Sequence, residues 1–457
     1  MAAYKSPSVT VTSVANSRII NISEDTRIPA FVGLGPAFRV VTAYPITRGS
    51  GAYDLLPSSG SAILSGLQVS SYPGASVSNP SWHNYFSLSG SNGSVYWGKN
   101  GHTLGVAGVN IPLVGSTYYV SYSYTVPTNQ YDAQTFVDSN DVVAAYGAET
   151  SGSLSTAARI ALENGAPAVL CVQVVPAGNP TALQSNFQDA IDKLSYKSNV
   201  AFVIPLSVDA TIQSKVIAHC NDESSPLIGH ERSCILGMKT TAVVNDFVNK
   251  AMALRDKRVI LVAPSVATRG NLTVAGPMIG AALAGLITAQ PKLITPVTGK
   301  QLTGFSITDD LYLPYEMNLM AGNGVCVITS QSGVIKVRHA ITTDPASADT
   351  REISVVIADD MVRRVTRDAL TSAYIGKGLV ISSSTPSQVA ATVASIWTGL
   401  IHDGLIDAYG TTFDPSTGEV PISAVQDPIE PTRINVTGSV RFLYPLNYID
   451  VTFFIYV

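Results

Sequence analysis

Ala168-Val-Leu-Cys-Val-Gln-Val-Val175 is a nearly continuous apolar run in the first half of the chain. Such a run is typical of a β-strand with both faces covered, as in the parallel sheets of α/β proteins. The segment that follows, residues 182–194, carries apolar side chains at a helical spacing. They are Leu183, Phe187, Ala190, Ile191 and Leu194. Together the strand and the helix predict an α/β domain.

The same alternation extends over residues 136–300. Residues 200–204 and 258–263 predict two more buried strands, and residues 209–219 and 242–254 predict two helices. Strands that alternate with helices imply a largely parallel sheet with right-handed crossovers. We therefore assign this segment to an α/β domain.

The preceding segment, residues 26–135, differs in composition. Gly, Ser, Tyr, Pro and Asn dominate, Lys and Arg are scarce, and no helical period is present. Asn-Gly pairs at 92–93 and 100–101 are strong turn signals between short apolar runs. Residues 116–126, rich in Tyr, Thr and Val, predict a strand. We expect an inserted β-rich domain of the sandwich or small-barrel kind.

Residues 301–441 mix helical and strand patterns and predict an α+β domain. The helices predicted in the C-terminal third are 277–288, 359–374 and 386–403. The predicted strands are 325–328, 334–339, 353–357 and 433–441. The expected fold class is therefore multidomain, α/β and α+β, with an α/β core, the β-rich insert and extended terminal β-arms.

Both ends of the chain, residues 1–25 and 442–457, are predicted to be strand arms. Residues 8–14 alternate and are rich in β-branched side chains, and residues 448–456 are apolar with a single charge. A free apolar strand promotes aggregation unless something covers its edge, and we expect another copy of the chain to do so. The side chains expected in these pairings are Val9, Val11, Val14, Ile449, Val451, Phe453 and Ile455.

Composition excludes several classes of function. The net charge of −4 provides no basic field for nucleic acid. The longest weakly polar stretch, residues 275–287, is shorter than the ~18 to 20 residues that cross a bilayer. We expect neither a nucleic-acid partner nor membrane insertion. Only 13% of the 457 residues are charged, against about 25% in ordinary soluble domains. This depletion favours large contacts between subunits, with an unusually compact single chain as the alternative.

The sequence carries no motif for nucleotide binding or nucleophilic catalysis. Gly33-Leu-Gly35 follows apolar residues, but Pro36 comes next and the helix that would hold a pyrophosphate is missing. A Gly-x-Ser-x-Gly elbow is absent from the α/β segment. We expect no catalytic residues and no cofactor.

Two clusters of reactive residues favour structural roles. His219, Cys220, His230 and Cys234 have spacings that fit no standard zinc site, so buried, reduced thiols are favoured over a bound metal. The adjacent carboxylates at 359–360 are better explained by a helix N-cap at the first of them than by acid/base chemistry. We expect no metal site.

Three arginines follow these carboxylates on one predicted helix. Arg363 and Arg367 are four residues apart and repel each other, and Arg364 lies beside them. The set is either an ordinary solvated face or a docking surface for an acidic partner. The pattern favours neither.

Six segments stand in a distinctive order from residue 301 onward. They are GNGV at 322–325, GVIKVRHAITT at 333–343, EISVVIADDMVRR at 352–364, YIGK at 374–377, PTRINVTGSV at 431–440 and PLNYIDVTFFI at 445–455. In order, spacing and position this set resembles the contractile tail sheath proteins of myovirus-type bacteriophages. The resemblance covers about a third of the chain, and residues 31–135 carry no matching motif.

The resemblance implies a structural virion protein of the tail sheath, without enzymatic activity or cofactor, assembled in the host bacterial cytoplasm. Its subunits would form stacked hexameric rings around a tail tube and contract to drive the tube through the host envelope. Tail tube, baseplate and tail terminator proteins are the implied partners. The β-rich domain would face outward, the arms would add strands to neighbouring subunits, and Arg363, Arg364 and Arg367 become candidates for docking the tube.

Three alternatives stay open. The chain could be the sheath of a phage-derived secretion or toxin-delivery device, which sequence barely separates from a phage tail. It could be an α/β enzyme with an unrecognised small-molecule site at the C-terminal ends of its strands. It could also be a different virion component, although tube proteins are usually much shorter.

Overall fold

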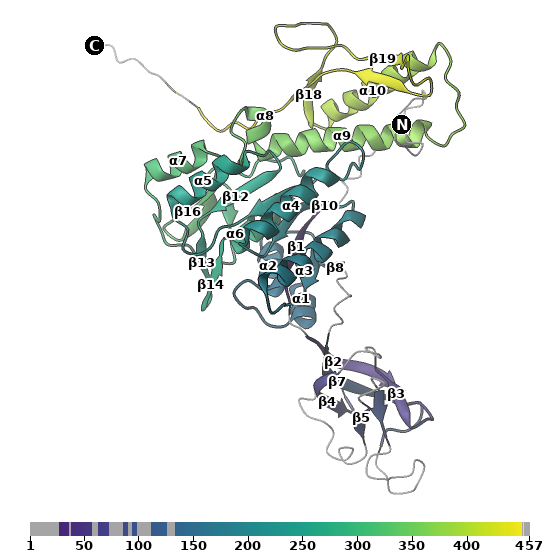
Figure 1. Ribbon diagram of the computed structural model, residues 1–457, viewed down its shortest axis with the longest axis vertical. Helices are drawn as coiled ribbons and strands as arrows, with labels where there is room; N and C mark the ends of the chain where they lie inside the picture. Colours follow the sequence, from purple (N-terminus) through teal and green to yellow (C-terminus); the bar gives the residue numbers. More distant parts are fainter. Residues whose placement is uncertain are drawn as a thin grey trace.

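The computed structural model describes residues 27–35, 38–56, 63–72, 86–89, 94–97, 111–125, 133–449 and 451. Figure 1 shows three parts along the long axis of the molecule. A small β-rich part lies at one end, an α/β body occupies the middle, and long helices with short strands lie at the other end. The expected multidomain α/β and α+β class is confirmed.

A nine-stranded sheet forms the body. Its strands are β1 (Ile28–Leu34), β8 (Ala133–Phe136), β9 (Val169–Val174), β10 (Val200–Pro205), β11 (Ser233–Leu236), β12 (Val259–Ala263), β15 (Gln301–Leu302), β16 (Val325–Gln331) and β17 (Val334–Val337). Their order is β15-β17-β16-β12-β11-β10-β1-β9-β8. The strands from β16 to β9 run parallel, and the edge strands pair antiparallel. Every residue of β9, β10 and β12 is buried, which explains their continuous apolar sequences.

Helices cover both faces of this sheet. One face is covered by α3 (Pro180–Asp192), α4 (Ala210–Glu223), α5 (Val244–Leu254) and α7 (Pro314–Gly322). The other is covered by α1 (Ser139–Tyr146), α2 (Leu154–Glu163) and α6 (Gly276–Thr288). A short 3-10 helix (Lys193–Tyr196) follows α3, and β13 (Val266–Arg269) pairs with β14 (Leu272–Ala275) before α6. Among the described residues, no helix is both long and apolar enough to cross a bilayer.

Local chemistry sets the helix starts. The Asp209 side chain accepts hydrogen bonds from the main-chain N–H groups of Thr211 and Ile212, at 2.9 and 3.0 Å, and so caps α4. The Asn179 side chain caps α3 in the same way through Ala182 N, at 2.8 Å. The caps start the two helices at Pro180 and Ala210. Both starts lie within two residues of those predicted, 182 and 209.

Strand β1 departs from expectation. The composition of residues 26–135 placed it in the β-rich domain, but β1 lies at the centre of the main sheet between β9 and β10. Phe31 pairs with Cys171 on one side and Ile204 on the other and is fully buried. Both partners lie more than a hundred residues later, so the local pattern carries no sign of the pairing. Strand β8 also belongs to the main sheet, and the insert begins after β1 and ends before β8.

The described strands of the insert form two three-stranded antiparallel sheets, in the orders β2-β7-β4 and β3-β6-β5. They are β2 (Phe38–Thr47), β3 (Tyr53–Leu55), β4 (Ile63–Ser70), β5 (Ser87–Ser89), β6 (Ser94–Tyr96) and β7 (Thr117–Thr125). The insert has its own core, and the Asn-Gly turn signals at 92–93 and 100–101 lie outside the described residues.

A buried carboxylate organises that core. Asp54 accepts hydrogen bonds from Trp97 Nε1 at 2.8 Å, Tyr118 OH at 2.9 Å and the main-chain N–H of Gly49 at 2.8 Å. Burial and the Asp54 charge together raise the pKa of Tyr118 well above its ordinary value. The Arg48 guanidinium lies 5.2 Å from the centroid of the Trp97 ring and also contacts Asp54. The network satisfies a buried charge that would otherwise destabilise the insert.

The C-terminal part packs on the body through a long helix. It consists of α8 (Ala348–Arg351), α9 (Ile353–Tyr374), α10 (Thr385–His402), β18 (Ile406–Tyr409), β19 (Ser423–Gln426), β20 (Ile434–Thr437) and β21 (Val440–Phe442). Strand β18 pairs with β21, and β19 pairs with β20. Val389, Val393, Ile396 and Leu400 of α10 form the centre of a separate apolar core under these strands.

One predicted strand of this part is wrong, and another is divided into two. Residues 353–357 are the start of α9. Their Ile and Val side chains are buried on every side of the helix, so the sequence shows no alternation of apolar and polar residues at the helical period. Residues 433–441 form two strands, β20 and β21, which belong to different sheets. The chain must turn between them near Gly438, where a Cβ atom would come within 2.9 Å of the Trp397 ring.

Candidate subunit interface

The small sheets of the C-terminal part have open edges among the described residues. Each sheet has two strands, so every strand has one side without a ladder partner. The inward side chains Ala424, Ile434 and Val436 pack against the core on α10, whereas Val425 on the outer face is 60% exposed. A row of unpaired main-chain N–H and C=O groups is a template for a strand from another chain.

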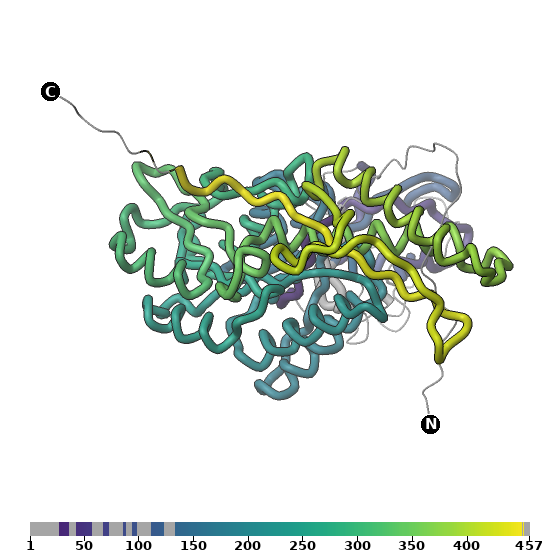
Figure 2. Tube along the Cα trace, turned by 90° about the horizontal axis from the view of Figure 1, so that it is seen from above, coloured from purple at the N-terminus to yellow at the C-terminus, as the bar shows by residue number. Residues whose placement is uncertain are grey.

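The segment after β21, residues 443–449 and 451, is an extended apolar tail that we call the C-terminal arm. It forms no strand pairing among the described residues and runs from β21 past α8 (Figures 1 and 2). Its large apolar side chains are between 48% and 80% exposed. They are Leu443, Tyr444, Leu446, Tyr448, Ile449 and Val451. Such a segment has the chemistry that an open sheet edge accepts.

The root of the arm is held on the body by polar contacts. Tyr444 OH donates a hydrogen bond to Asp349 in α8. Asn447 Nδ2 lies 3.3 Å from Glu352 Oε2 and 3.2 Å from His339 Nε2. These contacts fix the direction in which the exposed residues of the arm leave the body.

Asn447 contacts a carboxylate that belongs to a charged network. Glu352 Oε1 lies 3.0 Å from His339 Nε2 and accepts a hydrogen bond from Arg351 Nε at 3.2 Å. Burial by itself raises the pKa of Glu352, but its bonds to His339 and Arg351 outweigh burial and hold that pKa below its ordinary value. The Tyr448 ring meets the His339 ring edge-on, with centroids 6.2 Å apart. The carboxylate is therefore ionised and available to Asn447 at neutral pH.

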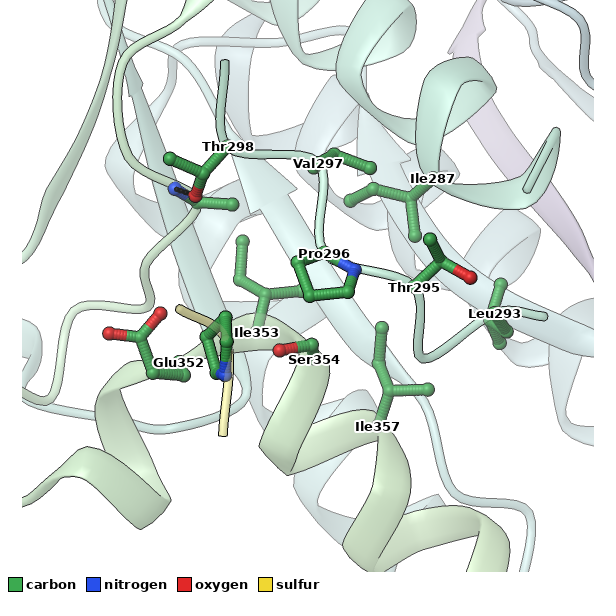
Figure 3. A pocket seen from close by; sticks show the side chains of 12 residues that line it. Ile287, Leu293, Thr295, Pro296, Val297, Thr298, Glu352, Ile353, Ser354 and Ile357 are labelled. Atoms are coloured by element: carbon green, nitrogen blue, oxygen red, sulfur yellow. Dashed lines mark hydrogen bonds between the residues drawn. The ribbon is translucent and has the colours of Figure 1, made fainter. Parts of the chain in front are cut away.

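A narrow gap between α9 and residues 293–298 is too small for a ligand. In Figure 3, Ile287 and Val297 lie across a gap from Ile353 and Ile357 of α9. Its cavity volume is about 10 Å³, no more than one water molecule needs. Pro445 of the arm also lines it. We interpret it as a small packing defect between α9 and the body, covered by the first residues of the arm.

The residues predicted to pair with neighbouring copies are only partly within the described structure. Ile449 and Val451 are 74% and 78% exposed, and they share one side of an extended chain. The other five predicted arm residues lie outside the described residues: Val9, Val11, Val14, Phe453 and Ile455. Strand pairing through these side chains stays a prediction.

The three arginines of α9 do not form one surface. Arg364 is only 9% exposed and donates hydrogen bonds to main-chain carbonyl oxygens of the body, so its assignment to a docking face is wrong. Arg367 forms an ion pair with the buried Glu231. Arg363 has a side chain that is 44% exposed and pairs with Asp359 at 2.8 Å. Of the three, only Arg363 stays a candidate for contact with a partner.

The carboxylate pair at 359–360 joins α9 to the sheet. Asp360 receives both terminal nitrogens of Arg258, at 2.8 and 2.7 Å, and both side chains are buried. Asp359 pairs with Lys257 at 3.1 Å. The predicted N-cap role of Asp359 is wrong, because α9 begins six residues earlier, at Ile353. Sequence reasoning missed the ion pair because its members are 102 residues apart.

Further buried arginines lie beside this pair. Arg27 donates to Val200 O at 2.6 Å and to Glu231 O. Burial, and after it the charge of Arg364, lower the pKa of Arg27 to about 9. Arg232 donates to Leu194 O at 3.0 Å, and it is also fully buried. The cluster ties α9, β10 and the helix ends of the body into one unit.

The cysteines of the predicted cluster are buried, and its histidines have hydrogen-bond partners. Cys220 and Cys234 are buried free thiols, and burial raises the pKa of Cys234. Burial lowers the pKa of His219 to about 4. His230 Nδ1 lies 3.1 Å from Glu223 Oε2. In the part of the chain that the structure describes, no group of three or more His, Cys, Asp or Glu residues could hold a metal ion.

Side chains pack closely against β1 where an α/β sheet usually binds its ligand. Such a site would lie at the C-terminal ends of β1, β9 and β10, where the strand order reverses. A Cβ atom on Gly33 would come within 2.6 Å of Leu206, and one on Gly35 within 2.6 Å of Gln173. The end of β1 leads directly into the insert. This geometry gives the enzyme alternative no support.

Comparison with known proteins points to one class. A tail sheath protein of Mycobacterium phage Bxz1 is 28% identical to this chain over 355 residues, which cover 74% of the chain and 58% of that protein. The chain thus spans less than two thirds of the length of the curated relative it matches. No protein-family model matches the sequence.

Solved structures share the fold. The helical sheath of the anti-feeding prophage in its contracted state superposes with a TM-score of 0.53 at 13% identity, covering 72% of this chain and 89% of that chain. The sheath of the extracellular contractile injection system PVC, also contracted, gives a TM-score of 0.53 at 17% identity and covers 71% and 88%. The predicted resemblance is confirmed: the chain is similar in sequence to a phage tail sheath protein and has the fold of contractile sheath proteins.

Proposed function

We propose that this chain is the subunit of a contractile phage tail sheath, polymerising as stacked hexameric rings around a tail tube. The observation that carries the proposal is the similarity to a tail sheath protein over 74% of the chain, together with the contractile sheath fold. The protein would be a virion component assembled in the bacterial cytoplasm. Its role would be structural rather than catalytic.

Strand addition would link the subunits. Among the described residues, the C-terminal arm presents exposed apolar side chains without a strand partner, and the small sheets of the C-terminal part have edges without a ladder partner. Each ladder hydrogen bond adds a net stabilisation of about 0.5 to 1.5 kcal/mol, and apolar burial adds to it. An arm seated on a neighbour would thus link subunits while hinges at its root let them move.

Contraction would move the subunits as nearly rigid bodies. The buried pair Arg258–Asp360 and its neighbouring arginines hold α9 to the body, which favours motion between subunits over motion within them. The extended sheath would be a metastable packing, and contraction would bury more surface between subunits. The work would be stored in the lattice, so no nucleotide would be needed.

The remaining partners follow from the same proposal. Tail tube, baseplate and tail terminator proteins would contact the rings, and the β-rich insert, which projects from the body in Figure 1, would face outward. Arg363 is the one predicted tube-docking residue with an exposed guanidinium.

A phage-derived delivery device is the second candidate. The solved structures named above come from such devices, and a shared sheath fold fits either setting. The sequence relative comes from a phage, which favours the phage tail.

Electron microscopy of the purified full chain tests the proposal. We expect long hollow tubes by negative staining. A chain that ends at Phe442 removes the arm, and we expect it to stay folded by circular dichroism but to form no tubes. Tyr444→Phe removes one anchoring hydroxyl while keeping the apolar arm, and this control should still assemble.

Two outcomes would contradict these expectations. Uniform small particles of the full chain at every concentration would overturn the sheath proposal. Tubes of normal length from the shortened chain would leave the sheath proposal standing but reject strand addition by the C-terminal arm.

A further inference from the structure

The β19–β20 hairpin ends in a stiff tip, Asp427-Pro-Ile-Glu-Pro431. The Asp427 carboxylate accepts hydrogen bonds from Ile429 N at 2.8 Å, Glu430 N at 3.0 Å and Asn435 Nδ2 at 2.9 Å. These bonds, led by that of Asn435, lower the pKa of Asp427 to about 2. Two prolines restrict the backbone further. The tip is therefore already ordered before it meets a partner, which reduces the entropy cost of binding.

The tip presents an apolar side chain beside an acid. Ile429 is 91% exposed, the highest value among the exposed large apolar residues of the described chain. Glu430 is exposed, and its carboxylate accepts a hydrogen bond from the Thr432 hydroxyl at 2.6 Å. In Figure 1, β19 lies near one end of α9, and α7 and α8 lie near the other. The tip thus projects from one side of the molecule with a hydrophobic knob and a negative charge.

A complementary cavity lies at the opposite end of α9. Its volume is about 450 Å³, within the range of ordinary binding pockets. The arm root forms one wall, and α7 and the segment after β17 form the others. The lining residues that matter here are Ala321, Arg338, His339, Arg351, Asn447 and Tyr448.

The cavity carries an excess of positive charge. Arg351 and His339 share the carboxylate of Glu352. Arg338 instead donates to Asn318 Oδ1 at 2.6 Å and to Met317 O at 3.4 Å, and none of the ion pairs recorded among the described residues includes it. A half-buried positive charge in a cavity wall, without a countercharge among the described residues, attracts an acid from a partner.

We propose that the hairpin tip of one copy docks in the arm-root cavity of the next, with Ile429 against Ala321 and Tyr448 and Glu430 paired with Arg338. The proposal rests on the proposed function and names one contact of the assembly. Because knob and cavity lie at opposite ends of the same part of the molecule, the contact is heterologous and repeats from copy to copy. Asn447 and Tyr448 line the cavity, so docking also steadies the root of the arm.

Site-directed cross-linking tests the contact. One full chain carries Ile429→Cys and a second carries Ala321→Cys, and the two are mixed with a short bismaleimide. The native cysteines are buried and do not compete. We expect a cross-linked dimer from the mixture, which neither chain forms alone. Val425→Cys, on the outer face of the same hairpin, is the matched control and should give no dimer with Ala321→Cys.

Charge reversal tests the ion pair. Glu430→Arg in the first chain, or Arg338→Glu in the second, should each reduce the dimer yield by about tenfold or more, as expected when like charges face each other in an interface. Both changes together should restore it. Asp189→Arg, at an exposed carboxylate on α3, makes the same charge change elsewhere and should have no effect. Thermal unfolding confirms that each variant is folded.

The outcomes separate the two proposals. Full chains that form tubes but give no dimer, or a dimer insensitive to both reversals, overturn the knob-and-cavity contact while the sheath proposal stands. If the Val425→Cys control also gives a dimer, the specific contact of Ile429 with Ala321 is overturned. A full chain that stays monomeric throughout overturns the proposed function and this contact with it.

Discussion

Asp359 and Asp360 are neighbours in sequence with opposite surroundings. Asp360 is 3% exposed and receives two hydrogen bonds from Arg258, whereas Asp359 is partly exposed beside Lys257 and Arg363. Successive helical residues point in different directions, so one carboxylate faces the body and the other faces solvent. A buried charge that loses its partner is costly, and a surface ion pair contributes little.

Replacing the two carboxylates separately should therefore give unequal results. Asp360→Asn leaves Arg258 buried without a countercharge and should lower the free energy of unfolding by about 3 kcal/mol. Asp359→Asn, the matched control, should cost less than about 1 kcal/mol. Urea unfolding followed by circular dichroism measures both. Equal losses would show that Asp360 does not hold α9 to the body in the way its hydrogen bonds indicate.

At the scale of elements, α6 shows how close packing constrains a helix. All thirteen of its residues are buried, and its glycines let neighbours approach. A Cβ atom on Gly285 would come within 2.8 Å of Ala161 Cα in α2, which is main chain and cannot rotate away. Gly399 in α10 is different, because a Cβ atom there meets open space.

The same substitution should consequently have opposite signs in these two helices. Gly285→Ala should lower the free energy of unfolding by about 1 to 3 kcal/mol, because overpacking pushes α2 from α6. Gly399→Ala should raise it by about 0.5 to 1 kcal/mol, because alanine is the better helix former. Thermal unfolding of the two variants compares them directly. Stabilisation by both would mean that α2 can shift without loss.

In the molecule as a whole, the insert has a core of its own. Among the described residues, this core around Trp97 and Tyr118 shares no buried apolar residue with the cores of the body. The chain leaves the main sheet at the end of β1 and returns at the start of β8, and only β9 lies between them. Two strand spacings are about 10 Å, which a linker of four residues spans.

Removing the insert should leave the body folded. A chain in which a Gly/Ser linker replaces residues 36–132 should keep the unfolding temperature of the body and lose the transition that belongs to the insert. Differential scanning calorimetry of the full and shortened chains shows both transitions. A shortened chain that unfolds at a much lower temperature would mean that the insert supports the sheet.

Most element types followed from local sequence patterns alone, with residues 353–357 at the start of α9 as an exception. The apolar run at 168–175 and the helical spacing at 182–194 predicted β9 and α3. The apolar C-terminal end predicted a strand arm paired with another copy, and that pairing stays a prediction. These features depend on the periodicity of a few successive residues, which burial on one or two faces dictates.

Which distant segments meet is visible only in the folded chain. The tertiary structure placed β1 at the centre of the sheet, buried Arg364, paired Asp360 with Arg258, and divided residues 433–441 between two sheets. It also set the hairpin tip and the basic cavity at opposite ends of α9. Each of these depends on contacts across tens to hundreds of residues, and such contacts leave no periodicity in the local sequence.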